Sequence, residues 1–176
     1  GSFAKLDASL EAEGMALGFA MNAGMYHRAL DPVGLCIENG PKVSGLITRD
    51  GPGNFGLLPN CVFCIADTFR VIESRAFKRD APACRFATQS GPMLVIDGAL
   101  HPRFLPASDS VHVRNGVGVS ADGAKAWFAV SDRPVTFHAF ASLFRDVLKT
   151  PDALFLDGSI SRLYSTELGR DDIGFP

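Results

Sequence analysis

The stretch Pro151-Asp-Ala-Leu-Phe-Leu-Asp157-Gly-Ser-Ile-Ser161-Arg-Leu-Tyr164 joins a short apolar run to a carboxylate, a glycine and two hydroxyls. The apolar run, residues 153–156, has the length and composition of a buried β-strand. Binding sites are often built at such strand ends, because the strand fixes the polar residue while the loop beyond it stays open to a ligand. Asp-Gly and Gly-Ser are also common turn pairs, so the stretch alone leaves a simple turn as the alternative.

A helical pattern comes directly before this strand. Its apolar residues recur at the spacing of one helix face, at Phe137, Phe140, Ala141, Phe144, Val147 and Leu148. Thr136 is placed to cap the first turn, and Thr150-Pro151 ends the helix, because the residue before a proline avoids the helical conformation. The pattern therefore predicts a helix that leads into the strand and packs on the same sheet.

The rest of the chain is rich in short strands separated by turn residues. The predicted strands are residues 16–21, 33–38, 60–66, 69–73, 86–89, 93–96, 111–119 and 125–130. Turns at Asn39-Gly40, Asp97-Gly98 and Asp122-Gly123 separate some of them, and the last two turns predict hairpins. A short opening helix is predicted at residues 3–13. Many strands and few helices predict an α+β fold, with a mixed, mostly antiparallel sheet in a single domain over residues 1–176.

Three further polar clusters resemble the Asp157 stretch, because each of them lies directly beside an apolar run. They are Asn22-Ala-Gly24-Met-Tyr-His27, Thr88-Gln89-Ser90-Gly91-Pro92 and Arg114-Asn115-Gly116. Each combines glycine, which lets backbone approach a ligand closely, with a side chain that hydrogen-bonds or carries charge. Four such junctions predict one shared pocket.

These four segments, in this order, resemble the phosphodiester glycosidase family. The resemblance rests on Asn-Ala-Gly-Met-Tyr, Thr-Gln-Ser-Gly-Pro-Met-Leu, Arg-Asn-Gly-Val-Gly-Val and Leu-Asp-Gly-Ser-Ile-Ser, and it covers residues 17–164. The family includes an enzyme that removes a masking N-acetylglucosamine from mannose 6-phosphate. That enzyme and many relatives carry a longer glycine-rich stretch where this chain has Gly158-Ser-Ile-Ser161, so the chain is more similar to a bacterial branch of unassigned substrate.

The resemblance implies hydrolysis of a sugar-1-phosphate diester, in a glycoconjugate or a cell-surface polysaccharide. Arg114 is the candidate for binding the phosphate, because the planar guanidinium fork matches phosphate oxygens. Asp157 is the candidate carboxylate for the anomeric carbon, as nucleophile, base or stabiliser of positive charge. The alternatives are an Arg114 that extends to the surface and an Asp157 that only caps a turn.

The remaining candidate site residues are predicted to contact the substrate. They are Asn22, Gly24, His27, Gln89, Ser90, Gly91, Asn115, Gly158, Ser159 and Ser161. The neutral side chains suit sugar hydroxyls, or else they satisfy the backbone of neighbouring strand ends. The glycines let main chain approach the ligand. The His27 side chain can donate to phosphate or act as acid or base, although a lone loop histidine is more often structural.

The composition excludes several classes of protein. The chain has 176 residues, 47% of them hydrophobic, and a formal net charge of −2 at pH 7, which does not fit nucleic-acid binding. No apolar run approaches the roughly 20 residues that span a bilayer. No secretory signal is visible behind Gly1-Ser2, and a periplasmic or extracellular location is what the family resemblance implies.

No cofactor is predicted, because no loop shows an ordered set of metal ligands. Oxygen ligands such as Asp157 with Asp31 or Asp50 leave a divalent cation as an open alternative. Cys61 and Cys64 lie three residues apart on a predicted strand, so they point to opposite faces and cannot hold one metal. We predict that all four cysteines, Cys36, Cys61, Cys64 and Cys84, are buried and unpaired, with a disulfide as the alternative in an exported protein.

Two other functions compete with hydrolysis of a diester. A non-catalytic carbohydrate-binding domain would bind sugar phosphates without turnover, but it would usually offer exposed aromatic platforms, and Trp127 lies in an apolar strand. A serine hydrolase would use Ser90 or Ser159, but the chain has no Gly-x-Ser-x-Gly motif and no recognisably paired histidine. Both are weaker than the glycosidase interpretation.

Overall fold

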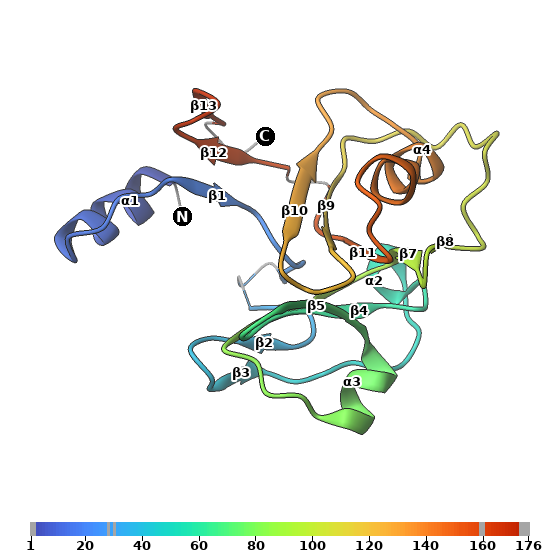
Figure 1. Cartoon of the computed structure of the whole chain (residues 1–176), viewed down its shortest axis with the longest axis horizontal. Coiled ribbons are helices and arrows are strands. Elements are labelled where there is room, and N and C mark those ends of the chain that lie inside the picture. Colours follow the sequence, from blue (N-terminus) through green and yellow to red (C-terminus); the bar gives the residue numbers. More distant parts are fainter. Residues whose placement is uncertain (1–2, 28, 30, 159–160, 173–176) are drawn as a thin grey trace. The chain divides into compact units, whose positions relative to one another are not determined.

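The computed structural model describes residues 3–27, 29, 31–158 and 161–172. Contacts between Cα atoms divide the chain into a smaller unit, residues 1–22 and 160–176, and a larger unit, residues 23–159. Figure 1 labels most of the helices and strands of both units. All strand pairs among the described residues are antiparallel, and a few short helices accompany them, which confirms the α+β class. The extent of the domain, residues 1–176, stays a prediction.

The smaller unit contains one helix and one three-stranded sheet. The helix is α1 (Phe3–Ala12), close to its predicted bounds, and the strands in sheet order are β1 (Phe19–Met21), β12 (Leu163–Ser165) and β13 (Arg170–Asp171). The rings of Phe3 and Tyr164 lie 5.9 Å apart between centroids. Strand β1, near the beginning of the sequence, therefore pairs with β12, near its end. The paired residues are more than 140 positions apart, so no local pattern predicts this pairing.

Five strands of the larger unit form a sheet that carries the predicted Asp157 strand in its middle. In sheet order they are β10 (Ala126–Val130), β9 (Asn115–Val119), β11 (Asp152–Phe155), β7 (Met93–Ile96) and β8 (Ala99–Leu100). The two predicted hairpins are confirmed, because β7 pairs with β8 and β9 pairs with β10.

A second five-stranded sheet lies against the first. In sheet order its strands are β3 (Lys42–Ser44), β2 (Cys36–Ile37), β6 (Phe86–Ser90), β4 (Cys61–Ile65) and β5 (Phe69–Glu73). Strand β5 contacts β9 and β11, and the rings of Phe63 and Phe128 meet edge to face with centroids 5.6 Å apart. Apolar residues alternate with others along the strands, so each sheet has an apolar face, and these two faces pack against each other.

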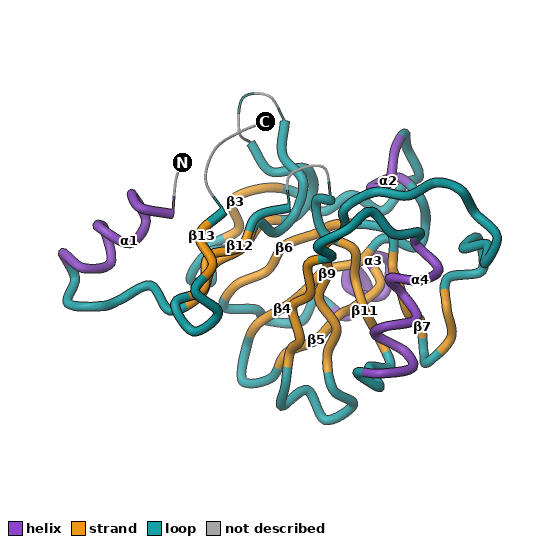
Figure 2. Tube along the Cα trace, turned by 90° about the horizontal axis from the view of Figure 1, so that it is seen from above, coloured by secondary structure: helices purple, strands orange, loops and turns teal. Residues whose placement is uncertain are grey.

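The free face of the first sheet is covered by the predicted helix. Helix α4 (Phe137–Ser142) continues as a π-helical turn, η1 (Leu143–Val147), and both contact β7 (Figure 2). The Thr136 hydroxyl accepts a hydrogen bond from the Ala139 N–H at 3.0 Å, which confirms the predicted cap. Phe140 and Phe144 are buried with Phe155 in one core cluster. Two short helices, α2 (Gly53–Gly56) and α3 (Ser74–Asp80), were not predicted.

The prediction of one long strand over residues 111–119 is wrong in its first half. The strand begins at Asn115, and His112 forms only an isolated bridge with Val135. The Arg114 N–H donates to the Ser131 hydroxyl at 2.9 Å instead of to a strand partner. The Ser131 hydroxyl therefore replaces the backbone carbonyl that would accept from Arg114 in a β-ladder. Residues 111–114 form a loop before the strand.

The prediction of four unpaired cysteines is also wrong, because Cys64 and Cys84 form a disulfide. Strand β4 carries Cys64, and the segment before β6 carries Cys84. Pairing of β4 with β6 brings the two Cα atoms to 5.6 Å. Cys36 and Cys61 are free, and burial raises the pKa of the Cys61 thiol well above its ordinary value. A separation of 20 residues gives no sign of this pairing in the sequence.

We expect removal of this disulfide to destabilise the chain. Replacing both cysteines by alanine should lower the free energy of unfolding by about 2–4 kcal/mol, because the unfolded chain loses a cross-link that closes the loop containing β5 and α3. Urea denaturation measures the loss, and Cys36→Ala, at a free and partly exposed cysteine, is the control. An unchanged denaturation midpoint in the double variant would contradict the expectation.

Candidate active site

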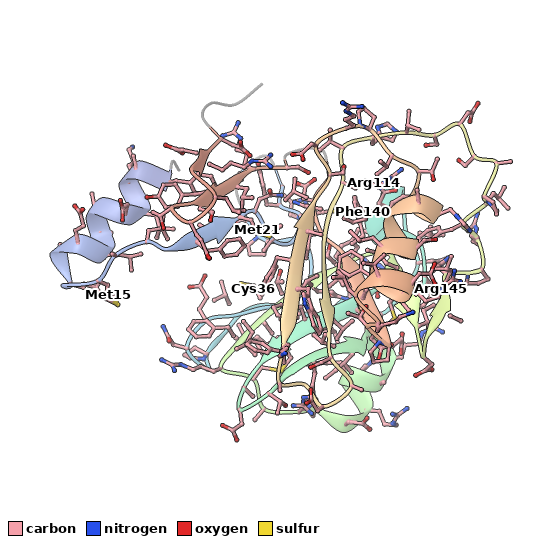
Figure 3. The ribbon with its side chains drawn as sticks, turned by 45° about the horizontal axis from the view of Figure 1, so that its top comes forward. Met15, Met21, Cys36, Arg114, Phe140 and Arg145 are labelled. Atoms are coloured by element: carbon pink, nitrogen blue, oxygen red, sulfur yellow. A yellow bond between two sulfur atoms is a disulfide. The ribbon has the colours of Figure 1, made fainter. Side chains whose placement is uncertain are left out.

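Arg114 is a buried charged residue on the face of the first sheet that α4 covers. Its side chain is 2% exposed, and Figure 3 shows it with Phe140 between the strands and the helix. The Nε donates to the Val135 carbonyl at 2.8 Å and Nη2 donates to the Ser110 carbonyl at 3.2 Å. The guanidinium carbon lies 3.5 Å from the ring centroid of Phe137. The charge is therefore held rigidly against an aromatic face.

The Arg114 guanidinium has hydrogen-bonding capacity that the described part of the chain does not use. A guanidinium has five N–H groups, and only two of them donate to the carbonyls above. Burial lowers the pKa of Arg114 to about 10, which still leaves the group charged at neutral pH. No carboxylate among the described residues forms an ion pair with it. Since an unpaired buried charge is costly, this site is suited to an anion.

A cavity of about 280 Å³ opens beside the guanidinium, and we call it the Arg114 cavity. Its described lining residues are Asn54, His112, Val113, Arg114, Phe155 and Gly158. Gly158 fits because it has no side chain: a Cβ there would lie 2.6 Å from Cζ of Phe155 and 3.0 Å from the Val113 carbonyl oxygen. The predicted site residues Arg114 and Gly158, which are far apart in sequence, are thus brought together by the fold.

Asp157 follows the end of β11, as the sequence predicted. Its N–H donates to the Ala23 carbonyl at 3.1 Å, which ties the start of the larger unit to this strand end. Phe155 and Gly158, on either side of it, line the Arg114 cavity, while Asp157 is not among the described residues that do. The backbone hydrogen bond therefore fixes the position of Asp157, which is half-buried and directly precedes Gly158 of the cavity lining.

Asn115 and Ser90 carry buried side-chain atoms without a described partner. Neither the Nδ2 nor the Oδ1 of Asn115 has a hydrogen bond to the described residues, and neither does the Oγ of Ser90. Both residues have no exposed surface. Gly116 faces Phe140 of α4, so Asn115, the strand residue before it, faces away from α4 and from Arg114. Buried groups of this kind are rare and often belong to binding sites.

Two backbone contacts bring these groups to the same end of the larger unit as Asp157. The Asn115 carbonyl accepts from the Leu156 N–H at 3.1 Å, one residue before Asp157. Gly24 packs on the Thr88 hydroxyl, and a Cβ there would lie 2.8 Å from the Gln89 carbonyl, next to Ser90. All four predicted clusters therefore contribute residues to one end of the two sheets.

Gln89 has a supporting role. Its Oε1 accepts from the Leu35 and Ile47 N–H groups at 3.0 Å each, and its Nε2 donates to the Ile47 carbonyl and to the Ser74 hydroxyl. All of these bonds go to other parts of the protein, so the structure assigns the side chain to the support of a loop. Its predicted contact with the substrate stays a prediction.

Gly91 packs closely against the segment that contains Asn54, one of the residues that line the Arg114 cavity. A Cβ at this position would lie 2.8 Å from Cβ of Asn60 and 2.9 Å from the Phe55 carbonyl oxygen. Asn60 itself donates from Nδ2 to that carbonyl at 3.2 Å. The close approach holds the α2 segment, which contains Asn54, in its place at the cavity wall.

The other predicted site residues lie elsewhere or outside the described residues. His27 is exposed in a turn, where its N–H donates to the Asp31 carbonyl at 2.8 Å, and it does not belong to the described lining of the Arg114 cavity. Asn22 and Ser161 belong to the smaller unit, where the Asn22 Oδ1 accepts from the Arg162 N–H at 2.8 Å. Ser159 lies outside the described residues.

Sequence reasoning did not name Asn54, His112 or Phe137 as site residues. Asn54 lies between the predicted strands 33–38 and 60–66, and Phe137 was assigned to the apolar face of the predicted helix. No local signal pairs either residue with Arg114. Within the described residues there is no group of three or more histidine, cysteine, aspartate or glutamate side chains placed to hold a metal ion. None of the described helices has the length and apolarity to cross a membrane.

A stability measurement shows whether the Ser90 hydroxyl stabilises the folded protein, as the hydroxyl of a structural serine does. We expect Ser90→Ala to leave the free energy of unfolding unchanged or to raise it, because its buried Oγ has no described partner to lose. Ser74→Ala is the matched control, since the Ser74 hydroxyl is buried and accepts from Gln89 at 2.7 Å. That variant should lose about 1–3 kcal/mol. Equal losses in urea denaturation would show that Ser90 is an ordinary structural serine.

Comparison with known proteins places the chain in a family. The model of the phosphodiester glycosidase family matches residues 16–171. YigE of Escherichia coli strain K12, described as an uncharacterized protein, is 38% identical over 165 residues, which are 93% of this chain and 64% of YigE. The chain thus spans less than two thirds of the length of this relative.

Two solved structures share the fold. One is the catalytic domain of zebrafish N-acetylglucosamine-1-phosphodiester alpha-N-acetylglucosaminidase, auto-inhibited by its pro-peptide, with a TM-score of 0.59, 16% identity, and coverage of 84% of this chain and 53% of that chain. The other is a hypothetical protein from Synechocystis, with a TM-score of 0.56, 14% identity, and coverage of 88% and 48%. At these identities the two structures show the fold alone. The match of the family model over most of the sequence shows that the chain belongs to the phosphodiester glycosidase family.

Proposed function

We propose that the chain hydrolyses a sugar-1-phosphate diester and separates the anomeric carbon of the sugar from the phosphate. Membership of the phosphodiester glycosidase family supports the reaction class. The observation that carries the proposal is the buried guanidinium of Arg114, which lies at a cavity. Two of its N–H groups donate to carbonyls, and the remaining N–H groups have no described acceptor.

Arg114 would bind the phosphate in this reaction. Guanidinium N–H groups match two phosphate oxygens at once, and Arg114 is held by two carbonyls and by the Phe137 ring before any ligand arrives. During cleavage of the bond to the anomeric carbon the phosphate leaves with added negative charge. A fixed positive charge stabilises that change more than it stabilises the intact diester, which lowers the barrier.

Asp157 would act at the anomeric carbon. As the phosphate leaves, positive charge develops on the sugar ring, and a carboxylate stabilises it, bonds to it or activates the attacking water. A phosphate leaves readily, so one carboxylate and one arginine suffice without a strong general acid. Asn115 and Ser90 are not among the described residues that line the Arg114 cavity, so their contact with the sugar stays a prediction.

The test of this proposal is hydrolysis of a panel of sugar-1-phosphate diesters in water labelled with ¹⁸O. Cleavage between the anomeric carbon and oxygen puts the label in the released sugar, and the product is a phosphate monoester. A simple diester without a sugar is the control and should not react. Label in the phosphate would make the protein a phosphodiesterase, and binding without turnover would make it a carbohydrate-binding domain.

We further propose that the chain works in an oxidising compartment. The support is the Cys64–Cys84 disulfide, since such bonds are rare in the reducing cytosol. Alkylation of thiols in intact cells, followed by mass spectrometry, tests the proposal. Free thiols at both positions would contradict it.

A further inference from the structure

A series of stacked rings leads from the Arg114 guanidinium to a buried histidine, His101. The Phe137 ring, whose centroid lies 3.5 Å from the guanidinium carbon, stacks on Phe104 with a centroid distance of 4.8 Å and an interplanar angle of 5°. The Phe104 ring stacks on the imidazole of His101, also at 4.8 Å, with an angle of 28°. His101 and Phe104 are both buried. We call the three rings the ring stack, and its two ends meet a charged and a titratable group.

The hydrogen bonds of His101 define its protonation state. The Arg103 N–H donates to Nδ1 at 3.2 Å, so Nδ1 carries no proton. Nε2 lies 3.1 Å from the Leu58 carbonyl oxygen, and a carbonyl only accepts, so Nε2 carries the proton and donates it. The imidazole is therefore neutral, and both of its nitrogens are bonded, which fixes the orientation of the ring.

The surroundings of His101 favour the neutral form. Burial is the main cause that lowers the pKa of His101, and the nearby charge of Arg103 lowers it further, while the bond to the Leu58 carbonyl acts in the opposite direction. Strand β7 presents the Leu94 carbonyl, which accepts from the His101 N–H at 3.2 Å. Helix α4, which contacts the neighbouring strand β8, carries the half-buried His138.

His101 is connected to two parts of the wall of the Arg114 cavity. Its bond to Leu58 holds the chain shortly after helix α2, which contains the lining residue Asn54. The ring stack leads to Phe137, which meets the lining residue Phe155 edge to face with centroids 4.9 Å apart. The position of one imidazole therefore affects both the support of the guanidinium and the segment across from it.

Protonation of the imidazole would disturb this arrangement. A proton on Nδ1 would face the Arg103 N–H, so two donors would oppose each other and a buried positive charge would appear. Either the ring turns or residues 101–104 move. Phe104 belongs to the same turn, which is closed by its N–H bond to the His101 carbonyl at 3.0 Å. Both movements therefore shift Phe104 against Phe137.

We infer that His101 is a positioning residue for Arg114, and that protonation of its imidazole weakens the binding of an anion at the guanidinium. This inference rests on the proposed role of Arg114 as the anion-binding group. The direction of the effect is diagnostic. Protonation of Asp157 or of His112 would make the region of the cavity more positive and would strengthen anion binding at low pH. A weakening therefore requires a group that acts through the position of Arg114.

Binding of sulfate tests the inference without any turnover. Sulfate keeps its charge while histidine titrates, so calorimetry between about pH 7.5 and about pH 5 follows the protein alone. We expect the wild-type affinity to fall by about tenfold as the pH falls, the effect of a weakened hydrogen bond between charged groups. The pKa of His101 lies below its ordinary value, so the fall should be centred below about pH 6.5.

Two variants remove the titration of His101 and keep part of its contacts. His101→Phe retains a ring for Phe104 to stack on, and His101→Gln retains a donor for the Leu58 carbonyl. We expect the affinity of both for sulfate to stay constant or to rise as the pH falls. His138→Gln, on helix α4, is the matched control and should show the same fall as the wild type.

The wild-type titration can overturn the inference without any variant, because an affinity that stays constant or rises toward low pH contradicts it. An equal fall in the His101 variants would place the titrating group elsewhere. Loss of the circular-dichroism spectrum over the same range would make the effect global unfolding and would also overturn the positioning role. A wild type that binds no sulfate at any pH would overturn the anion site itself. Binding that weakens as expected, without cleavage of any diester, leaves the inference in place and contradicts only the proposed reaction.

Discussion

Arg114→Met is expected to lower kcat/KM for the best diester by at least about a hundredfold, the usual effect of removing a group that stabilises charge in a transition state. Methionine is unbranched and apolar, so it can follow the path of the arginine stem past Phe137 without the charge. The loss should appear mainly in kcat, because the charge on phosphate grows as the bond to the sugar breaks.

The conservative variant Arg114→Lys shows whether the planar fork matters. Lysine keeps a positive charge, but it cannot bond at once to the Val135 and Ser110 carbonyls and to two phosphate oxygens. Its activity should therefore lie between those of the wild type and Arg114→Met. Thermal melting of both variants shows whether they fold. If Arg114→Met folds and keeps activity within about threefold, Arg114 only supports the loop of residues 110–113, and the assignment of the phosphate site is wrong.

Asp157→Asn is expected to lower kcat by about a hundredfold or more, with a small change in KM. Asparagine has nearly the same shape, and the backbone bond from residue 157 to the Ala23 carbonyl is unaffected. The variant therefore removes the negative charge that we propose stabilises the anomeric carbon.

Asp152→Asn is the matched control, because Asp152 lies at the opposite end of the same strand, β11. Its carboxylate accepts from the Asp97 N–H at 3.2 Å, and burial raises the pKa of that carboxyl. We expect kcat of this variant to stay within a few-fold of wild type. Full activity in Asp157→Asn, or equal losses in both variants, would show that Asp157 is a turn residue and not part of the reaction.

Much of the secondary structure could be predicted from local pattern. The spacing of Phe137, Phe140 and Phe144 gave α4, and the apolar run before Asp157 gave β11. The hairpins at Asp97-Gly98 and Asp122-Gly123 followed from turn chemistry. These features depend on neighbours within a few residues, which the sequence displays directly. The predicted strand over residues 111–119 was wrong in its first half, because the Arg114 N–H bonds to the hydroxyl of Ser131, which local pattern does not reveal.

The candidate site was predicted only as a set of residue types. Asp157, Arg114 and Gly158 were named from the ends of apolar runs, and the fold brings Arg114 and Gly158 to one cavity. The sequence did not show that the Gln89 side chain forms its hydrogen bonds with a loop of the protein. It also did not show that Asn54 and His112 share the cavity.

The sequence by itself therefore determined the α+β class, the positions of the main strands and helix, and the chemical groups available for binding an anion and a sugar. Tertiary structure alone decided the Cys64–Cys84 bond, the pairing of the two ends of the chain and the partners of Arg114. The physical reason is the range of the interactions. Periodicity and turn chemistry act over a few residues, whereas the burial of a charge depends on which distant segments, here those of Val135 and Phe137, close around it.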